Sequence, residues 1–282
     1  MNKKIGVIDV GGGCRGVYAA GVFDYFLDNN ITFDLGIGVS AGSANIASFT
    51  AKQDRRNYKF YTEYALRPEY MGMKNFIAKK SFIDLDYVYG TLTNDDGEYP
   101  IDYDTYMDNT MEFYIVATNA ITGDAHYFNK NEMQRNQYDA FKASSCIPFV
   151  CPPYIINDIP YYDGALADPV PIQKAFDWGC DKVVLILTLP IDTIRDNRQD
   201  TFLAKRIQKK YPLAAEKLMQ RANLYNTSIQ LAKEYENKGK LLIIAPNDTC
   251  GVSTLSRNQD DLIKLYDKGY LDGAKINNFT LA

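Results

Sequence analysis

The stretch Leu35-Gly36-Ile37-Gly38-Val39-Ser40-Ala41-Gly42-Ser43-Ala44 decides the fold of this chain. Its apolar first half, Leu35–Val39, predicts a buried strand, and the small residues from Ala41 to Ala51 predict a helix that starts at once. A serine in a tight turn between a strand and a helix needs neighbours without bulk, and the helix N-terminus favours developing negative charge. The sequence therefore predicts a nucleophile elbow, made of Gly38, Val39, Ser40, Ala41 and Gly42. The alternative is a plain glycine-rich turn in which Ser40 only caps the helix.

A second glycine-rich loop follows the first predicted strand. Lys4–Val10 predicts that strand and Gly16–Asn29 a helix, and the loop between them is Gly11-Gly12-Gly13-Cys14-Arg15-Gly16. Consecutive glycines can turn successive N–H groups toward one point, which creates an anion-binding loop. The loop also matches the GxGxxG dinucleotide fingerprint and resembles the phosphate loops of sugar-kinase-like ATPases. A dinucleotide site needs an acid after the second strand, whereas Asp34 precedes it. Phosphate or nucleotide binding stays open as the alternative function.

The rest of the chain alternates between apolar runs and amphipathic segments. Further strands are predicted at Glu112–Asn119, Ala125–Phe128, Lys182–Leu189 and Leu241–Pro246. Further helices are predicted near Tyr58–Ala65, at Asn136–Ser145, at Ile172–Trp178, within 197–238 and at Asn258–Ile276. One stripe of the region 197–238 is apolar: Leu218, Ala222, Tyr225, Ile229 and Ala232. This alternation indicates an α/β fold, a mostly parallel sheet flanked by helices on both faces.

No internal repeat, low-complexity linker or shift in composition divides the chain. Residues 1–282 are therefore expected to form a single domain. The candidate motifs fall within 4–190, and the region from about 195 to 282 is expected to be a helical cap or C-terminal extension.

Composition excludes several classes of protein. The 282 residues carry a formal net charge of −4, which argues against a nucleic-acid partner because such proteins usually present a basic surface. The five cysteines form no CxxC pair, so neither a disulfide framework nor a zinc ribbon is indicated, and a reducing cytoplasm is the expected location. No apolar run approaches the ~20 residues that span a bilayer. The sequence gives no indication of oligomeric state.

A single histidine restricts the possible catalytic bases. His126 lies within the return strand of a predicted hairpin, where a side chain usually serves cross-strand packing. If Ser40 is a nucleophile, its base is then expected to be a carboxylate. Asp163 is one candidate, because the glycine after it allows the backbone to bend and burial raises a carboxyl pKa. The alternative is a plain turn aspartate.

Three motifs become specific when they are taken in order. GGGCRG at 11–16, GVSAG at 38–42 and DGA at 163–165 together resemble the signature of the patatin-like phospholipases. The resemblance covers Lys4 to about Thr188, and continues more loosely through Gly251–Asp272. It implies a modified α/β-hydrolase fold of three layers.

The resemblance also implies an activity, the metal-independent hydrolysis of acyl esters in lipids without a cofactor. Ser40 would be the nucleophile, and Asp163 of the motif Asp163-Gly164-Ala165 would accept its proton. The backbone of Gly11, Gly12 and Gly13 would form the oxyanion hole within the motif that Cys14, Arg15 and Gly16 complete. An acyl-ester or lipid substrate implies transient contact with a membrane surface. The basic, Met-containing stretch Met71–Lys80 is either a lid or lipid-facing element or an ordinary surface helix.

Overall fold

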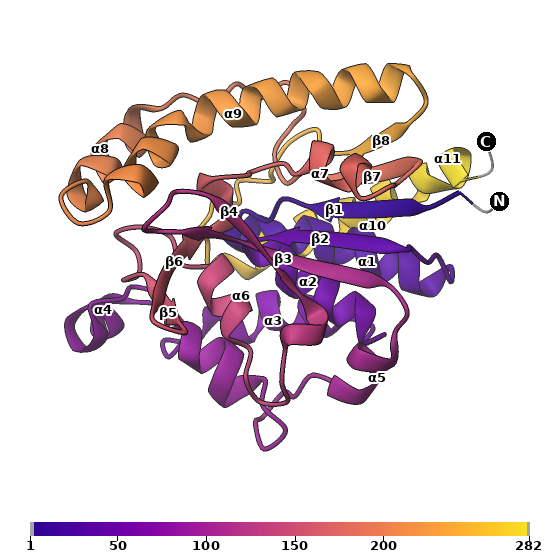
Figure 1. Ribbon diagram of the computed structural model, residues 1–282. Coiled ribbons are helices and arrows are strands. Elements are labelled where there is room, and N and C mark those ends of the chain that lie inside the picture. The colour runs from indigo at the N-terminus through magenta and orange to yellow at the C-terminus, as the bar shows by residue number, and fades with distance from the viewer. Residues whose placement is uncertain (1–2, 281–282) are drawn as a thin grey trace.

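The protein contains one eight-stranded sheet between layers of helices (Figure 1), and the computed structural model describes residues 3–280. The strand order is β5-β6-β3-β2-β1-β7-β8, and β4 pairs with β3 outside this path. Five strands are mutually parallel: β1 (Ile5–Asp9), β2 (Leu35–Val39), β3 (Glu112–Asn119), β7 (Lys182–Ile186) and β8 (Leu241–Ile244). Three strands pair antiparallel with their neighbours: β4 (Ala125–Asn129), β5 (Tyr154–Ile156) and β6 (Ile159–Asp163). The predicted α/β fold with a mostly parallel sheet is confirmed.

Helices cover both faces of this sheet. The main helices are α1 (Val17–Asp28), α2 (Ala41–Thr50), α3 (Arg56–Thr62), α4 (Met73–Lys79), α5 (Tyr103–Asp108), α6 (Asp139–Ser144), α7 (Ile172–Asp177), α8 (Arg198–Ile207), α9 (Pro212–Asn237), α10 (Gln259–Gly273) and α11 (Asn277–Thr280). Single turns of 3-10 helix lie at Gly13–Gly16, Tyr64–Leu66, Lys130–Glu132, Gly164–Leu166 and Ala274–Ile276, and a π-helical segment spans Tyr87–Leu92.

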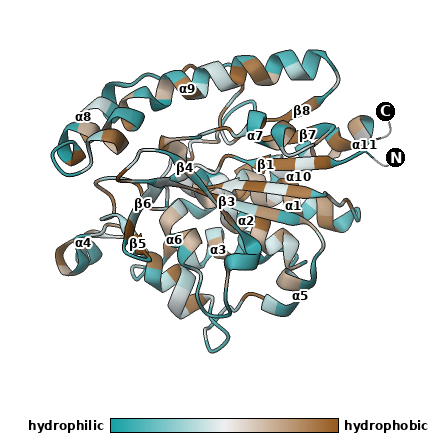
Figure 2. Cartoon of the chain, in the orientation of Figure 1, coloured by the Kyte–Doolittle hydropathy of each residue, from teal (hydrophilic) through white to brown (hydrophobic). Residues whose placement is uncertain are grey.

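Two apolar cores hold the layers together. On one face α1, α2, α6 and α10 bury a large aromatic cluster that includes Phe23, Phe26 and Phe113 against the sheet. On the other face α7 and α9 pack against β1, β2, β7 and β8. The central strands are mostly apolar, whereas α9 carries both kinds of residue (Figure 2), as expected for a helix with one face in solvent. The predicted stripe on α9 is confirmed, because all five of its residues are buried.

The sheet contains one hairpin, β5–β6, that was not among the predicted strands. Strands β5 and β6 are joined by Asn157 and Asp158, which both have positive φ (49° and 63°). Two such residues form the two-residue turn that best matches the twist of a hairpin. Pro160 lies within β6, where its carbonyl accepts a hydrogen bond from Ala120 N. Asp163 is therefore the last residue of a strand, β6.

Two smaller differences separate the predicted helices from the observed ones. The helix expected from Asn136 begins at Asp139, because Asn136 adopts a left-handed conformation (φ 62°) that a right-handed helix excludes. The stretch between 53 and 110 contains α3, α4, the π-helical segment and α5, whereas helices were expected only near Tyr58–Ala65 and, as one alternative, within Met71–Lys80.

Candidate active site

Ser40 occupies a strained turn between β2 and α2. Its backbone has φ 55° and ψ −131°, a conformation that non-glycine residues rarely adopt. The Ser40 N–H donates to Ser144 Oγ at 2.8 Å, and the Ser40 carbonyl accepts from Ser43 Oγ at 2.6 Å. These two contacts fix the turn from both sides and leave the side chain, which is 7% exposed, to project from it.

The two glycines of GVSAG are required by close packing around this turn. A Cβ at Gly38 would lie 2.4 Å from Ser43 Cα, and a Cβ at Gly42 would lie 2.3 Å from the Asp9 carbonyl oxygen. Neither position has room for a methyl group. The strand–turn–helix context expected of the elbow is therefore present at Gly38, Val39, Ser40, Ala41 and Gly42.

Strand β3 brings the ends of β2 and β6 together. It pairs with β2 over residues 112–116 and with β4 over 114–118, so these two partners lie on opposite edges. It pairs with β6 over residues 117–119, and β4 already pairs with the other edge of β3 at 117 and 118. Strand β6 therefore lies on the same edge of β3 as β2, just beyond the point where β2 ends.

This register places Asp163 beside Ser40. Val39 is paired with Val116, and Asp163 is paired with the next residue, Ala117. Ser40 and Asp163 thus emerge from adjacent positions on one edge of β3, although 123 residues separate them in the sequence (163 − 40). The Ser40 hydroxyl lies close enough to the Asp163 carboxylate to lower the pKa of Asp163.

The environment of Asp163 suits a proton acceptor. The side chain is 3% exposed, and this burial raises the pKa of Asp163 above its ordinary value. The nearby Ser40 hydroxyl, the hydrogen bond from Ala165 N (2.8 Å) and the charges of Arg221 and Arg195 all lower the pKa of Asp163. Gly164 allows the chain to turn after the carboxylate, since a Cβ there would lie 2.2 Å from the Val116 carbonyl oxygen.

The loop Gly11–Gly13 faces the same turn with unusual backbone geometry. Its glycines have φ values of 66°, 125° and 60°, and a Cβ at Gly11 would lie 2.3 Å from the Val39 carbonyl oxygen. Gly11 N donates to Asp9 Oδ1 at 2.9 Å. Within residues 3–280, no acceptor faces the N–H of Gly12 or Gly13. The donors free to receive a ligand oxygen are therefore those of Gly12 and Gly13.

The second half of the GGGCRG motif is tied to the C-terminal part of the chain. Cys14 is buried and donates its N–H to the Thr254 carbonyl at 3.0 Å, and Arg15 Nη1 donates to Thr254 Oγ1 at 2.9 Å. A Cβ at Gly16 would lie 2.4 Å from Tyr61 Oη, so a larger residue there would have to displace the Tyr61 side chain.

Two cavities meet at Ser40. The first is apolar, reaches between α2, α3 and α6, and is lined by side chains such as Ala44, Phe60, Leu85 and Phe141. The second is polar and extends toward α8 and α9, past Asp163. Gly13, Ser40, Ile147 and Thr254 line both cavities. Their volumes of about 70 and 200 Å³ exceed the ~10–15 Å³ that one water requires.

The other candidate functional residues lie away from Ser40 or do not come together as a site. His126 is exposed on β4, packs against Phe128 and Tyr161, and lines neither cavity at Ser40. Asp34, the acid that a dinucleotide site would use, accepts from Ile5 N at 2.7 Å at the opposite end of the sheet from the glycine loop. In the part of the chain that the structure describes, no group of three or more His, Cys, Asp and Glu side chains could hold a metal ion.

The sequence patterns did not identify Asp9 and Ser144, two residues that hold the glycine loop and the Ser40 turn in place. Asp9 is fully buried beneath the glycine loop and accepts from both Gly11 N and Asn45 Nδ2. Burial raises its pKa to about 6. An acid at the end of a buried strand was a visible signal for this role. No sequence signal pointed to Ser144, whose partner is 104 residues away.

The comparisons with known proteins decide the family. A model of the family described as Patatin-like phospholipase matches residues 10–176, which include all three motifs. The chain belongs to this family. Patatin-like phospholipases are lipid ester hydrolases. A second model, a domain of unknown function (DUF6363), matches residues 211–278, from α9 to α11.

Two further proteins resemble this patatin-like chain. The uncharacterized protein YjjU of Escherichia coli (strain K12) is 30% identical over 192 residues, 66% of this chain and 52% of YjjU. The chain thus spans about half the length of this relative. The crystal structure of VipD from Legionella pneumophila aligns with 98% of this chain and 67% of VipD, with a TM-score of 0.50 and 14% identity. The likeness to VipD is one of fold alone. No helix within residues 3–280 is long and apolar enough to cross a bilayer.

Proposed function

We propose that this patatin-like protein is a serine acyl hydrolase that cleaves lipid carboxylic esters with a Ser40–Asp163 dyad. The observation that carries the proposal is the register on β3, which puts the strained Ser40 beside the buried carboxylate of Asp163. A nucleophile and a base within hydrogen-bond reach are what acyl transfer through a covalent intermediate requires.

The first half of the reaction forms an acyl-enzyme. Asp163 accepts the Ser40 proton while Oγ attacks the ester carbonyl carbon, and the C=O electrons move to the carbonyl oxygen. The N–H groups of Gly12 and Gly13 donate to this oxyanion, and loss of one such donor typically costs about 100- to 1000-fold in rate. Collapse of the intermediate breaks the bond to the alcohol oxygen, which takes the proton from Asp163.

The second half releases the acid. Water gives a proton to Asp163 as its oxygen attacks the acyl carbonyl, and collapse of the new intermediate returns that proton to Ser40 Oγ. Each proton is exchanged with Asp163, so the steps need neither a metal nor a histidine. The apolar cavity beside Ser40 suits the acyl chain, because its lining is mostly aromatic and aliphatic.

We further propose that residues 1–282 act as one domain in which the region from about 195 to 282 caps the site. Helices α8 and α9 support this arrangement, since Asp200, Leu203, Arg221 and Tyr225 line the polar cavity together with Ser40. The five free cysteines, four of them buried, support a cytoplasmic location.

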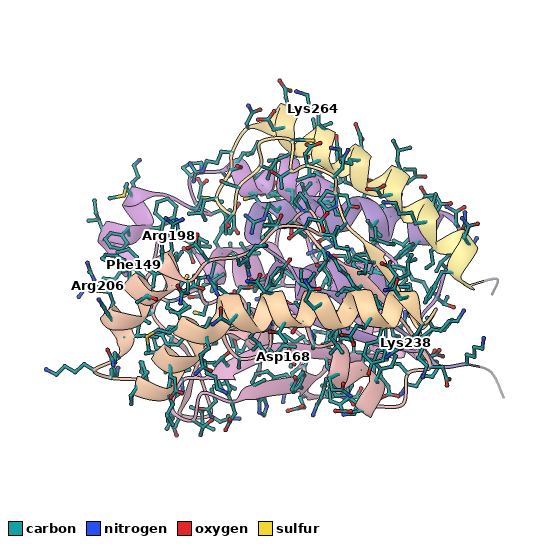
Figure 3. All side chains as sticks on the ribbon, turned by 90° about the horizontal axis from the view of Figure 1, so that it is seen from above. Phe149, Asp168, Arg198, Arg206, Lys238 and Lys264 are labelled. Carbon is teal, nitrogen blue, oxygen red and sulfur yellow. The ribbon has the colours of Figure 1, made fainter. Side chains whose placement is uncertain are left out.

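We also propose that exposed residues on α4 and at the α8 end of the molecule contact the membrane surface. Met73, Phe76 and Ile77 are exposed on α4, and none of the residues of that helix is buried. Phe149 and Arg206 lie side by side at the α8 end of the molecule (Figure 3), with Arg206 Cζ 5.5 Å from the centre of the Phe149 ring. Exposed apolar residues interspersed with cations suit contact with an anionic lipid surface.

The experiment that tests the proposed activity is hydrolysis of a short-chain p-nitrophenyl ester by the purified protein. The wild type is expected to hydrolyse the ester, and Ser40→Ala and Asp163→Asn are expected to be inactive while keeping the wild-type circular dichroism spectrum. Turnover by a folded Ser40→Ala variant equal to that of the wild type would remove Ser40 from the mechanism. Full activity of Asp163→Asn would likewise show that Asp163 is not the base.

A further inference from the structure

The apolar cavity at Ser40 follows one face of α2. Ala41, Ala44 and Ala47 all line it, and they lie three residues apart on the helix that begins directly after Ser40. Residues at this spacing share one face of a helix. Their small side chains leave space beside the helix, so the cavity leads from Ser40 toward the C-terminal end of α2.

An arginine lies at the far end of this cavity. Arg56 is the first residue of α3, lines the cavity and is only 8% exposed. Its Nη1 donates to the hydroxyl of Ser48 at 3.4 Å, and Ser48 directly follows Ala47 on α2. The helix rises about 12 Å between positions 40 and 48, at 1.5 Å per residue. The guanidinium therefore lies at the end of the cavity that is remote from Ser40.

Arg56 has no acidic partner. Arg55, the residue before it, pairs with Asp28 at 2.8 Å, but no carboxylate oxygen among residues 3–280 lies within 4.0 Å of the Arg56 guanidinium. Arg56 Nη2 donates to the Tyr99 carbonyl at 3.0 Å and to Thr93 Oγ1 at 3.3 Å. These neutral acceptors hold the guanidinium in place without neutralising its charge.

Two polar groups at this end of the cavity have no hydrogen-bond partner in the described part of the chain. One is Nε of Arg56 and the other is the hydroxyl of Tyr138, and both atoms are buried. Tyr138 is 3% exposed and lines the same cavity as Arg56. Buried polar groups of this kind cost free energy unless a ligand satisfies them. Both groups can donate, so an acceptor between them would satisfy both.

The charge at this end of the cavity is uncompensated at neutral pH. Burial lowers the pKa of Arg56 to about 10, which still leaves the guanidinium charged at pH 7. The groups that oppose this shift are tyrosines, such as Tyr99, Tyr89 and Tyr138, and burial raises the pKa of each of these three hydroxyls. They are therefore neutral at pH 7. An anion here would offset the cost of burying the cation.

We propose that the apolar cavity binds an acyl chain with a carboxylate at its far end, and that Arg56 and Tyr138 bind this carboxylate. The proposal rests on the proposed function, because it places the ester of the same molecule at Ser40. A guanidinium matches carboxylate oxygens in geometry as well as in charge. An extended chain of about eight carbons, with its contacts at both ends, covers a span of about 12 Å. The favoured substrate is therefore a monoester of a medium-chain dicarboxylic acid rather than a plain fatty acyl ester.

The test compares p-nitrophenyl octanoate with the mono-p-nitrophenyl ester of suberic acid, in which a carboxylate replaces the terminal methyl group. The wild type is expected to have the higher kcat/KM for the suberate ester. Arg56→Met removes a charged hydrogen-bonding partner and is expected to lower the ratio of suberate to octanoate kcat/KM by about 10- to 100-fold. Arg67→Met is the control, because it removes the same charge from an ion pair with Glu98 outside the cavity. It is expected to keep the wild-type ratio.

A second variant removes a hydroxyl alone. Tyr138→Phe deletes a group that bonds to nothing in the described residues, so the fold is expected to persist, and the ratio is expected to fall by about 3- to 10-fold. Tyr106→Phe is the matched control, since its hydroxyl is also buried without a partner but does not line the cavity. An unchanged ratio in Arg56→Met and Tyr138→Phe, or a wild-type preference for the octanoate ester, would overturn the proposal.

Binding without turnover separates this site from the proposed hydrolase. Monomethyl suberate is titrated calorimetrically into Ser40→Ala and into the double variant Ser40→Ala with Arg56→Met. The double variant is expected to bind at least about 10-fold more weakly. A wild type that hydrolyses no ester, together with binding that depends on Arg56, would refute only the hydrolase and keep the carboxylate site. If no ester is hydrolysed and the two variants bind monomethyl suberate equally or not at all, both proposals fail.

Discussion

Gly164 lies so close to Val116 that a Cβ on Gly164 would be 2.2 Å from the Val116 carbonyl oxygen. Because Val116 also pairs with Val39, this contact fixes how far Asp163 stands from Ser40. Gly164→Ala is expected to push the two strands apart, with a loss of about 1–3 kcal/mol in the free energy of unfolding. Ester hydrolysis is expected to fall by about 100-fold, since small displacements of a reacting group are that costly.

Gly90→Ala is the matched control for this substitution. A Cβ at Gly90 would meet no atom within 4 Å. Urea unfolding and p-nitrophenyl ester kinetics on both variants measure the two effects. Wild-type activity in Gly164→Ala would show that this contact does not set the spacing of the dyad.

Ser144 is expected to act by positioning the nucleophile turn. Ser144→Ala removes the acceptor of the Ser40 N–H, so a strained turn loses its main external contact. The expected result is a fall in kcat of about 10- to 100-fold with KM little changed. Ser48→Ala is the control, since Ser48 is also buried on the adjoining helix but its hydroxyl donates to Asn57. Equal kcat values for the two variants would refute a positioning role for Ser144.

The pH dependence of hydrolysis reports on Asp163. The base must be ionised to accept a proton, and burial raises its pKa, so kcat/KM for a neutral ester is expected to fall on acidification at a pH above the ordinary range of an aspartate. The positive charge of Arg195 opposes this rise, so Arg195→Gln is expected to move the acidic limb to still higher pH. Arg206→Gln, whose guanidinium lies over Phe202, is the control and should leave the limb unmoved. A limb at an ordinary aspartate pKa in all three proteins would contradict this assignment of the base.

The apolar cavity is expected to set the preferred acyl length. Ala44 lies on α2 and lines this cavity beside Ser40, so Ala44→Leu adds bulk where the chain would pass. The ratio of kcat/KM for long-chain to short-chain p-nitrophenyl esters is expected to fall by about 10-fold. Ala78→Leu on the exposed side of α4 controls for the added side chain. An unchanged ratio in Ala44→Leu would mean that the acyl chain lies elsewhere.

Membrane contact is expected to depend on α4. Ile77 is 78% exposed, and Ile77→Asp replaces an apolar contact with a charge that an anionic surface repels. Sedimentation with vesicles of phosphatidylglycerol and phosphatidylcholine should show binding weakened by about 10-fold. Leu271→Asp is the matched control, at 73% exposure on α10. Equal weakening by both substitutions, or by neither, would rule out α4 as the docking element.

Local sequence patterns predicted most of the parallel core. The bounds of β2 and β3 are those expected, because both are continuous apolar or alternating runs with clear ends. The hairpin β5–β6 was missed because Pro160 argues against a central strand, although Asn157-Asp158 carried the turn signal.

The candidate site could be predicted only in part from the sequence, because some of its residues come together only in the folded protein. Ser40 and the glycine loop stand in motifs whose spacing is local, and Asp163 was reached through resemblance and the lack of a suitable histidine. Ser144 and Arg195 act through contacts made only after the sheet has assembled. Their roles depend on the register of β3 and on the packing of α9, which no local pattern encodes.

Intact-protein mass spectrometry after reaction with a fluorophosphonate is the sharpest test of the Ser40–Asp163 dyad, because the reagent captures an activated serine without any assumption about the lipid. One adduct is expected on the wild type, mapped by peptide digestion to Ser40. No adduct is expected on Ser40→Ala, and a strongly slowed reaction is expected in Asp163→Asn. An adduct on a different residue, or labelling of Asp163→Asn at the wild-type rate, would contradict the Ser40–Asp163 dyad.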